Sequence, residues 1–351
     1  MGLGRVVATL GAAVAVLSLS LGPSLTAPVS AADSAGAYDV RVGTFNLSSV
    51  SFDFKAGGDH RTWRERRPAV VSQILQQRLD VVGLQEANQS IKYAGGLDFG
   101  ANQYLDLKNA LNRRGGNYAL TNEAAYDCVK ATSSYNCVYQ DRNASQDNRI
   151  MYDTDRVSLV RQGSEKFRTQ TPGKNERYLV WAVLRMKATG RTFFFTDTHL
   201  DPYSAATRKG QWQESIDMTN RLKDGHPVVA VGDYNTSKWD GYAATMLPKM
   251  RANGYGDVLN QQYAKNLAKP RAESVKRGWV NSFNGFRRDV RAYAYEDAKY
   301  KIGNSIDWIF VTNSVRVKQW SNVTAVDEKT NLTKGVIPSD HALVRATIVL
   351  D

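Results

Sequence analysis

The sequence predicts an α/β fold in which two largely antiparallel sheets pack as a sandwich. Short apolar segments of strand length outnumber helical patterns by roughly two to one, which favours a fold dominated by sheets. Two of these segments, residues 178–186 and 192–200, flank a short turn with Gly190, as in an antiparallel hairpin. The 351 residues, of which 42% are hydrophobic, are enough to bury a large core. These features favour a sandwich over a doubly wound parallel sheet.

Nine segments have the apolar or alternating pattern of strands. They are residues 40–47, 80–85, 149–152, 178–186, 192–200, 228–232, 306–311, 315–320 and 342–350. Several of them are enriched in Thr and aromatic residues, which suit strands. In the segment 315–320, valines alternate with basic residues, which indicates one buried and one exposed face.

The first predicted helix lies near residues 62–75. Thr62 and Glu65 have the spacing of a capping box, and an apolar stripe runs through residues 70–75. Pro68 conflicts with one continuous helix from Thr62, so the sequence places the helix start at Arg67 or Pro68.

Two further helices are predicted at residues 104–111 and 205–222. Residues 239–301 are less periodic, basic and rich in Tyr. We expect helices and long loops there, over the rim of the sheets.

Residues 1–32 are predicted to be a secretory signal. Arg5 supplies a positive start, and the apolar run at residues 6–21 is shorter than the ~20 residues that a membrane-spanning helix needs. Val29-Ser30-Ala31 has the small-x-small pattern of a signal peptidase site, with cleavage after Ala31 or Ala32. A retained membrane anchor is the alternative. We expect a secreted, extracellular protein with one domain at residues 38–351 and no transmembrane anchor after cleavage.

Cys128 and Cys137 are the two cysteines of the chain. In an oxidising compartment such a pair is more often bonded than free, so we predict a disulfide that closes a loop rich in Tyr and Ser. The sequence has no CxxC motif and no Cys/His cluster that would indicate structural zinc.

The chain is basic, with a formal charge of +12 and a pI near 9.5. Removing the signal takes away one charged residue, Arg5, and leaves about +11. A polyanion is therefore a candidate partner, and a solvated basic surface is the alternative. The basic clusters are Arg113–Arg114, Lys276–Arg277 and Arg287–Arg288 with Arg291, the last interleaved with Tyr293, Tyr295 and Tyr300.

Polar residues of particular types lie at the ends of six apolar segments, where a rigid sheet can hold functional side chains. They are Asn46, Glu86, His199, Asp233 with Asn235, Asp307, and Asp340 with His341. An unpaired carboxylate at Asp307, inside an apolar strand, would be costly. His60 and His226 lie outside this pattern, and we predict that both are surface residues.

Taken in order, these segments resemble the endonuclease/exonuclease/phosphatase superfamily, whose members include deoxyribonucleases, apurinic endonucleases, sphingomyelinases and inositol polyphosphate 5-phosphatases. The matching segments are TFN ending at Asn46, LQE ending at Glu86, TDTHLD around His199, GDYN with Asp233 and Asn235, SIDWIF around Asp307, and SDH from Ser339 to His341. The resemblance covers residues 40–350. It implies a four-layer α/β sandwich with the site where the two sheets open, and hydrolysis of a phosphoester that depends on Mg²⁺ or Mn²⁺.

The resemblance also implies a metal site. Glu86 would be a metal ligand, with Asn46 and Asp340 beside it. Oxygen ligands of this kind suit hard cations such as Mg²⁺, which keep several waters.

The remaining residues take catalytic roles by the same resemblance. Asp233 would position or deprotonate the attacking water, and Asn235 would hold a phosphate oxygen. His199 and His341 would contact the scissile phosphate, with Asp307 orienting His341. This inventory agrees with the chemistry, because phosphoester hydrolysis needs a positioned water and stabilised phosphoryl oxygens. One further residue, Asn148, would lie near the phosphate.

Three functions remain open from the sequence. The basic charge favours a secreted nuclease with nucleic acid as its substrate. We expect a monomer with no stable protein partner. A hydrolase of lipid headgroups or small phosphates is the alternative, and residues 279–280 and 283–286 are its only candidates for a membrane-binding hairpin. A non-catalytic binding module on the same fold would leave gaps among the acidic and histidine positions, and the motifs have none.

Overall fold

The computed structural model describes residues 1–2, 39–91, 100–238, 240–259, 271–291 and 303–350. Most of the predicted signal segment and the tyrosines at 293, 295 and 300 lie outside these ranges. Within the described part of the chain, no helix is both long enough and apolar enough to cross a membrane.

A seven-stranded mixed sheet forms one half of the fold. Its strand order is β10-β12-β15-β1-β2-β4-β3, and the central neighbours β1 and β2 run parallel. The strands are β1 (Asp39–Asn46), β2 (Val81–Gln85), β3 (Tyr118–Leu120), β4 (Arg149–Asp153), β10 (Ser274–Lys276), β12 (Arg316–Asn322) and β15 (Val344–Val349). Apart from β1–β2 and the edge pair β10–β12, the strands pair antiparallel.

A six-stranded sheet forms the other half and has the same plan. Its order is β5-β6-β7-β8-β11-β9, and only β7 and β8 pair in parallel. The strands are β5 (Val157–Lys166), β6 (Tyr178–Met186), β7 (Thr192–His199), β8 (Val228–Asp233), β9 (Tyr255–Asp257) and β11 (Asp307–Thr312). A separate two-stranded ribbon joins β13 (Val326–Asp327) and β14 (Leu332–Thr333).

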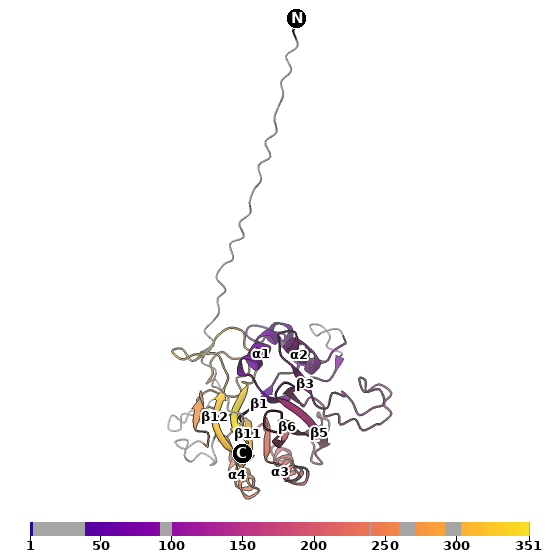
Figure 1. Ribbon diagram of the computed structural model, residues 1–351, viewed down its shortest axis with the longest axis vertical. Coiled ribbons are helices and arrows are strands. Elements are labelled where there is room, and N and C mark those ends of the chain that lie inside the picture. Colours follow the sequence, from indigo (N-terminus) through magenta and orange to yellow (C-terminus); the bar gives the residue numbers. More distant parts are fainter. Residues whose placement is uncertain (3–38, 92–99, 239, 260–270, 292–302, 351) are drawn as a thin grey trace. The chain divides into compact units, whose positions relative to one another are not determined.

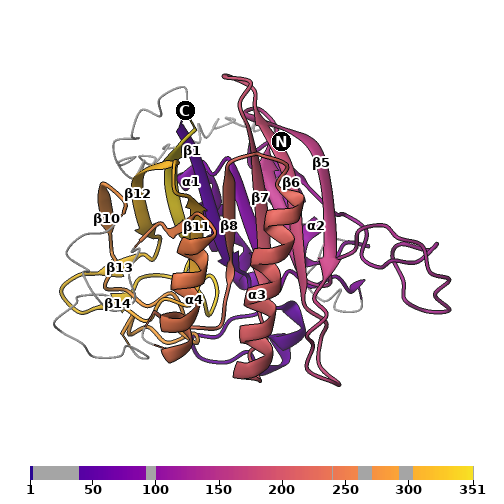
Figure 2. The ribbon, with the colours of Figure 1, turned by 90° about the horizontal axis from the view of Figure 1, so that it is seen from below.

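Helices cover the outer face of each sheet, so the fold has four layers (Figure 1). The helices α1 (Trp63–Gln77) and α2 (Gln103–Asn112) pack on the seven-stranded sheet, while α3 (Ala205–Leu222) and α4 (Gly241–Ala252) pack on the six-stranded one. Figure 2 shows α3 and α4 in front of their sheet, with their axes roughly along its strands. A third apolar core fills the space between the sheets. The predicted four-layer sandwich with two largely antiparallel sheets is confirmed.

The predicted start of the first helix is wrong. The helix begins at Trp63, after a short 3₁₀ helix (η1, Val50–Lys55), and contains Pro68 in its interior. The capping box is present, because the Glu65 carboxylate accepts hydrogen bonds from the backbone N–H and the hydroxyl of Thr62. Pro68 removes one intrahelical donor, but it lies on the exposed side, where water can bond the released carbonyl. Burial of Trp63 and the following apolar stripe outweighs that loss.

The longest strand that the sequence analysis missed is β5, an edge strand paired with β6 along its whole length. Its sequence, VSLVRQGSEK, is largely polar, and most of its residues are partly or fully exposed. The strand pairs only with β6, so its other edge has no neighbouring strand. The charged side chains and the irregular register near Leu159 are typical of an edge strand protected against further pairing.

The predicted disulfide between Cys128 and Cys137 is present, with the two Cα atoms 5.3 Å apart. It closes a turn in the long connection between β3 and β4. Because β4 runs antiparallel to β2, β4 starts beside the end of β2. The connection therefore leaves the seven-stranded sheet at that end of its strands.

Removal of the disulfide should loosen this loop without unfolding the domain. In the chain-entropy model a short closed loop contributes roughly 2–3 kcal/mol at most, and the bond lies outside the three large apolar cores. We expect the Cys128→Ser/Cys137→Ser variant to keep its far-ultraviolet circular dichroism and to unfold at a modestly lower urea concentration. Loss of the folded spectrum in the variant, or two free thiols by mass spectrometry in the native protein, would contradict the prediction.

Candidate active site

Strand pairing in the six-stranded sheet brings three of the predicted residues into one row. The parallel pair β7–β8 sets His199 opposite Asp233, and the antiparallel pair β8–β11 sets Asp307 opposite the same residue. Asp233 is the last residue of β8 and is flanked on both sides, so its carboxylate lies at the centre of the row.

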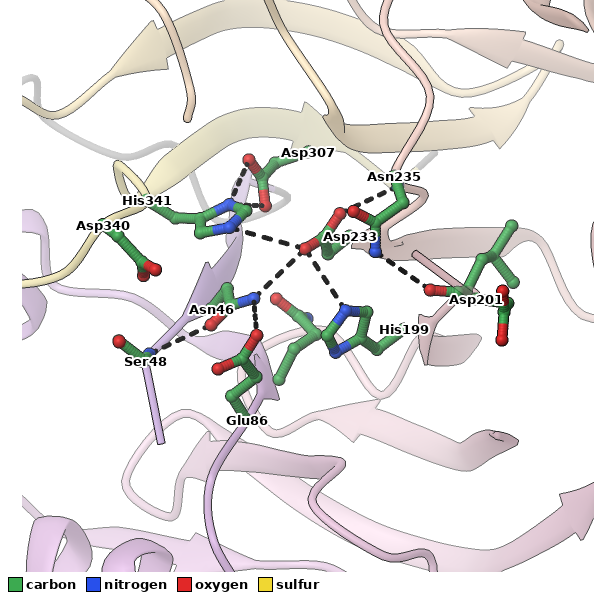
Figure 3. Close-up of polar contacts among 12 residues, drawn as sticks. Asn46, Ser48, Glu86, His199, Asp201, Asp233, Asn235, Asp307, Asp340 and His341 are labelled. Atoms are coloured by element: carbon green, nitrogen blue, oxygen red, sulfur yellow. Dashed lines mark hydrogen bonds and ion pairs between the residues drawn. The ribbon is translucent and has the colours of Figure 1, made fainter. Parts of the chain in front are cut away.

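The seven-stranded sheet presents its polar residues at the same opening. Asn46 ends β1, and Glu86 follows β2, which runs parallel to β1. Asp340 and His341 precede β15, whose antiparallel pairing with β1 returns them to this end. The Ser339 hydroxyl donates to the backbone oxygen of Asn46 at 2.7 Å and ties the two segments together. Figure 3 shows the side chains converging from both sheets.

Two glycines allow the close approach that this convergence needs. A Cβ atom at Gly83 would lie 2.5 Å from Oδ1 of Asp197 on the opposite sheet. Gly232 has a φ of +155°, and a Cβ there would lie 2.2 Å from the carbonyl oxygen of Thr198. Neither contact is sterically possible, so a side chain at either position would displace the strand ends that carry the site.

The carboxylate of Asp233 is the hub of the site. Its Oδ2 accepts a hydrogen bond from Asn46 Nδ2 at 3.1 Å and lies 3.5 Å from Nε2 of His199 and 3.6 Å from Nε2 of His341. Its Oδ1 accepts from the backbone N–H of Asn235 at 2.9 Å. Burial, together with the nearby charge of Asp307, raises the pKa of Asp233 to about 7.

The two histidines next to Asp233 have opposite protonation tendencies. Burial opposes a charge on His341, but the carboxylates of Asp307 and Asp233 outweigh it and raise the pKa of His341 well above its usual value. Nδ1 of His341 lies 3.0 and 3.2 Å from the two oxygens of Asp307. Burial and the positive charge of Arg177 instead lower the pKa of His199 well below its usual value. The site therefore pairs a cationic histidine with a neutral one.

The predicted metal residues lie together. Glu86 accepts hydrogen bonds from Asn46 Nδ2 and from the backbone N–H of Ser49, both at 3.1 Å. Burial and the neighbouring Asp340 carboxylate raise the pKa of Glu86. Two carboxylates this close together fit a hard divalent cation, which would relieve their repulsion. The Asn46 oxygen accepts from the backbone N–H of Ser48 at 3.0 Å, so this amide bridges Glu86 to Asp233.

A second group of ligand atoms also has a spacing suited to a cation. Oxygens of Asp233 and Asp307 and a ring nitrogen of His341 lie within 4.8 Å of one another. Because Asp307 already engages Nδ1 of His341, the oxygens of Glu86 and Asp340 are the better fit for Mg²⁺ or Mn²⁺. A cation bound there would supply positive charge to a phosphoryl oxygen and orient water.

Asn235 and Asn148 lie at the site but are engaged in the fold. Asn235 has a φ of +47°, and its Nδ2 donates to the carbonyl of Leu200 at 3.0 Å. Asn148 Nδ2 donates to Oδ2 of Asp197 at 3.0 Å. Asp197 is fully buried and accepts a second hydrogen bond from the Gln85 amide. Asp197 was not among the predicted site residues, although it stands two residues before His199 on the same face of β7.

A second residue missed by the sequence analysis is Arg66, which is fully buried behind the metal residues. Its guanidinium donates to the carbonyls of Leu47, Ser48 and Pro338 at 2.7 to 3.0 Å, and so joins the end of β1 to the segment that carries Asp340. An arginine among polar helix residues gives no sequence signal for this role.

The two histidines predicted to be surface residues are both half-buried. His60 stacks on Phe286 with ring centroids 4.0 Å apart, and its Nε2 is buried without a hydrogen-bond partner among the described residues. The charge of Asp340 acts on His60, so His60 borders the site. His226 contacts the hydroxyl of Thr192 through Nδ1 at 3.1 Å, at the other end of β7.

The model of the Endonuclease/Exonuclease/phosphatase family matches residues 43–341. The chain belongs to this family. Members of the family are phosphoester hydrolases, and the chain is therefore an enzyme of this class. The family generally uses a divalent metal, in agreement with the carboxylate pair at Glu86 and Asp340.

Three relatives illustrate the range of the family. Nocturnin from Drosophila melanogaster is 26% identical over 223 residues, which are 60% of this chain and 30% of that protein. A mannosyl-6-phosphatase from Bacteroides thetaiotaomicron has a TM-score of 0.60 at 19% identity, with 89% of this chain and 100% of that one covered. TDP2 from D. rerio, complexed with single-strand DNA product, has a TM-score of 0.54 at 16% identity, with 89% and 99% covered. The two structures support the fold alone.

Replacing Asp307 by Asn should lower the pKa of His341, because Asp307 is the strongest of the groups that raise it. If hydrolysis requires protonated His341, activity is present below this pKa and is lost as the pH rises through it. The alkaline limb of the kcat/KM profile should then move to lower pH. Proton NMR of the histidine rings gives the shift directly.

The exposed Asp217→Asn variant is a matched control, because Asp217 accepts only a surface hydrogen bond from Gln213. Its profile should equal that of the wild type. An alkaline limb in Asp307→Asn that coincides with the wild-type limb would show that this pair does not set the pH dependence.

Proposed function

We propose that the chain is a secreted phosphodiesterase that uses Mg²⁺ or Mn²⁺ to hydrolyse nucleic acid. The observation that carries the proposal is the position of Asp233. Its carboxylate lies near the neutral His199 and the cationic His341. Two further carboxylates, Glu86 and Asp340, come from the other half of the fold.

The roles follow from these contacts. Asp233, with its pKa raised to about 7, is suited to orient a water and accept its proton near neutral pH. His341, cationic and oriented by Asp307, is suited to donate to a phosphoryl or leaving oxygen. Glu86 and Asp340 would hold the metal ion, with Asn46 fixing the orientation of Glu86. Asn148 and Asn235 border the phosphate position in this proposal.

The basic surface supports a polynucleotide substrate. Arg287 and Arg291 are exposed on the segment that follows Asn284, and Asn284 is tied to the Asp340 backbone by its own N–H at 2.7 Å. Arg113 and Arg114 lie at the opposite end of the sheet, beside the start of β3. One predicted cluster therefore lies next to the site, and another is remote from it. The relative bound to a single-strand DNA product is consistent with such a substrate.

The membrane-hairpin candidates do not favour a lipid substrate. Val280 is buried in a small core with Val290 and Val326, and Phe283 packs on His341 with ring centroids 5.0 Å apart. Val280 and Phe283 therefore pack inside the protein instead of forming an exposed hairpin. Hydrolysis of a small sugar phosphate remains the second candidate, because the mannosyl-6-phosphatase shares the fold.

The deciding experiment measures hydrolysis by the purified mature protein. The substrates are duplex DNA, single-stranded DNA, RNA, sphingomyelin, inositol phosphates and mannose 6-phosphate, each with Mg²⁺, Mn²⁺ or EDTA. We expect cleavage of a polynucleotide that EDTA abolishes and either metal restores, because the site offers oxygen ligands for a hard cation.

Asp233→Asn, His341→Ala and Glu86→Gln should each reduce turnover by at least about 10²-fold while keeping the fold. Full activity in any two of these variants would refute the assigned site. Full activity in excess EDTA would refute the metal requirement, and hydrolysis confined to a small phosphate would favour the second candidate.

Salt dependence separates the two candidates by binding alone. With Asp233→Asn protein, affinity for single-stranded DNA should fall with salt by a log–log slope near −0.7 per neutralised phosphate. Arg287→Glu/Arg291→Glu should weaken binding and flatten this slope. Arg113→Glu/Arg114→Glu, the same charge change at the remote end of the sheet, is the control and should bind nearly as the wild type does. Equal effects of the two double variants would remove the support from the basic surface.

A further inference from the structure

Arg177 stands at the opening of the site, directly before β6. The antiparallel pairing of β6 with β7 sets Leu179 opposite Thr198, so Arg177 lies at the end where β7 carries His199. Burial is the larger cause of the lowered pKa of His199, and the positive charge of Arg177 is the second cause. The same charge also acts on Asp147, the neighbour of Asn148, and lowers the pKa that burial raises there. Arg177 therefore lies on the side of the site that holds His199 and Asn148.

The guanidinium of Arg177 makes no hydrogen bond to the described residues. Its Nε is buried and makes no hydrogen bond. The hydrogen bonds of Arg177 are made by its backbone, whose N–H donates to Gln170 Oε1 at 3.0 Å and whose carbonyl accepts from Phe167 and Gln170. A buried donor without a hydrogen bond is costly, and a bound anion would satisfy it.

Other arginines with an unbonded Nε differ from Arg177 in this respect. Arg149 and Arg345 use their terminal nitrogens for hydrogen bonds to neighbouring groups. Arg277 also has an unbonded Nε, but it follows the edge strand β10, and its charge is not among those that shift His199, His341 or Asp233. Only Arg177 in this group combines an unpartnered guanidinium with a position at the site.

We propose that Arg177 is a substrate-binding residue whose guanidinium bonds non-bridging oxygens of the substrate phosphate on the His199 side of the site. The planar fork of arginine matches two phosphate oxygens, and its charge needs no proton exchange to be present. The proposal rests on the proposed phosphodiesterase function and adds a cation that the sequence motifs do not contain. It adds a fixed positive charge on the His199 side of the site.

The fold does not depend on this side chain. Because Gln170 and Phe167 hold the backbone of Arg177, truncating the guanidinium breaks no hydrogen bond within the described residues. The Arg177→Met variant keeps an unbranched stem of similar length and should melt within about 2 °C of the wild type.

The test measures binding of inorganic phosphate by isothermal titration calorimetry in the presence of Mg²⁺, on the full mature protein. For Arg177→Met we expect the phosphate Kd to rise by about 10- to 100-fold, as for the loss of a charge-assisted hydrogen bond. Arg177→Lys keeps the charge but not the planar fork, so its phosphate Kd should lie between those of the wild type and Arg177→Met. Arg168→Met removes an exposed arginine from the same segment and should bind as the wild type does.

Steady-state kinetics on the best substrate of the panel give a second readout. Arg177→Met should lower kcat/KM by a similar factor, while Arg168→Met leaves it unchanged. A phosphate Kd in Arg177→Met equal to that of the wild type, no phosphate binding by the wild type, or an equal loss in Arg168→Met would each overturn the proposal. Phosphate binding does not require turnover, so it decides the role of Arg177 even if the panel shows no polynucleotide cleavage and the proposed function fails.

Discussion

Hydrogen bonds from amides of one sheet to carboxylates of the other hold the site together. Asn46 donates to Asp233, and Gln85 and Asn148 both donate to Asp197, so each bond joins the seven-stranded sheet to the six-stranded one. These groups are buried, and loss of either partner would leave an unsatisfied polar group that costs about 1–3 kcal/mol. The bonds form only because Gly83 has no side chain to separate the sheets. The position of Asp233 relative to Glu86 is therefore fixed by packing between the sheets as well as by strand pairing within them.

The electrostatic asymmetry of the site follows from this arrangement. Asp233 is buried, and its pKa is raised to about 7, so its ionised form is destabilised in the absence of a bound cation. His341 is placed between Asp233 and Asp307 and gains a proton, while His199 has Arg177 on its side and remains neutral. Two histidines that contact the same carboxylate oxygen thus differ in charge because of their outer neighbours. Such a difference is what a site with separate proton donor and acceptor needs.

The sequence predicted the parts of the site that depend on local order. Strand ends are visible as apolar runs that stop at Asn46, Glu86 or Asp233, and antiparallel or parallel pairing then brings those ends together. The residues that the sequence missed depend on partners that are remote in the chain. Arg66 binds the carbonyl of Pro338, 272 positions away, and no periodicity reveals such a contact. Pro68 misled the placement of α1 because tertiary burial of Trp63 overrides a local helix-breaking signal.

Two arginines near the site differ in how their guanidinium groups are used. Arg66 is buried and donates four hydrogen bonds to backbone carbonyls, so its guanidinium mainly stabilises the loops that carry the site. In Arg177 the backbone is hydrogen-bonded, while the guanidinium makes no hydrogen bond to the described residues. One arginine is thus used for the architecture of the site and the other is left for what enters it. Arg66 acts electrostatically on Glu86 and Asp340, whereas Arg177 acts on His199, which lies 3.5 Å from the carboxylate of Asp233. In the proposed function, a divalent metal at Glu86 and Asp340 and the guanidinium of Arg177 would both balance the negative charge of the bound phosphate.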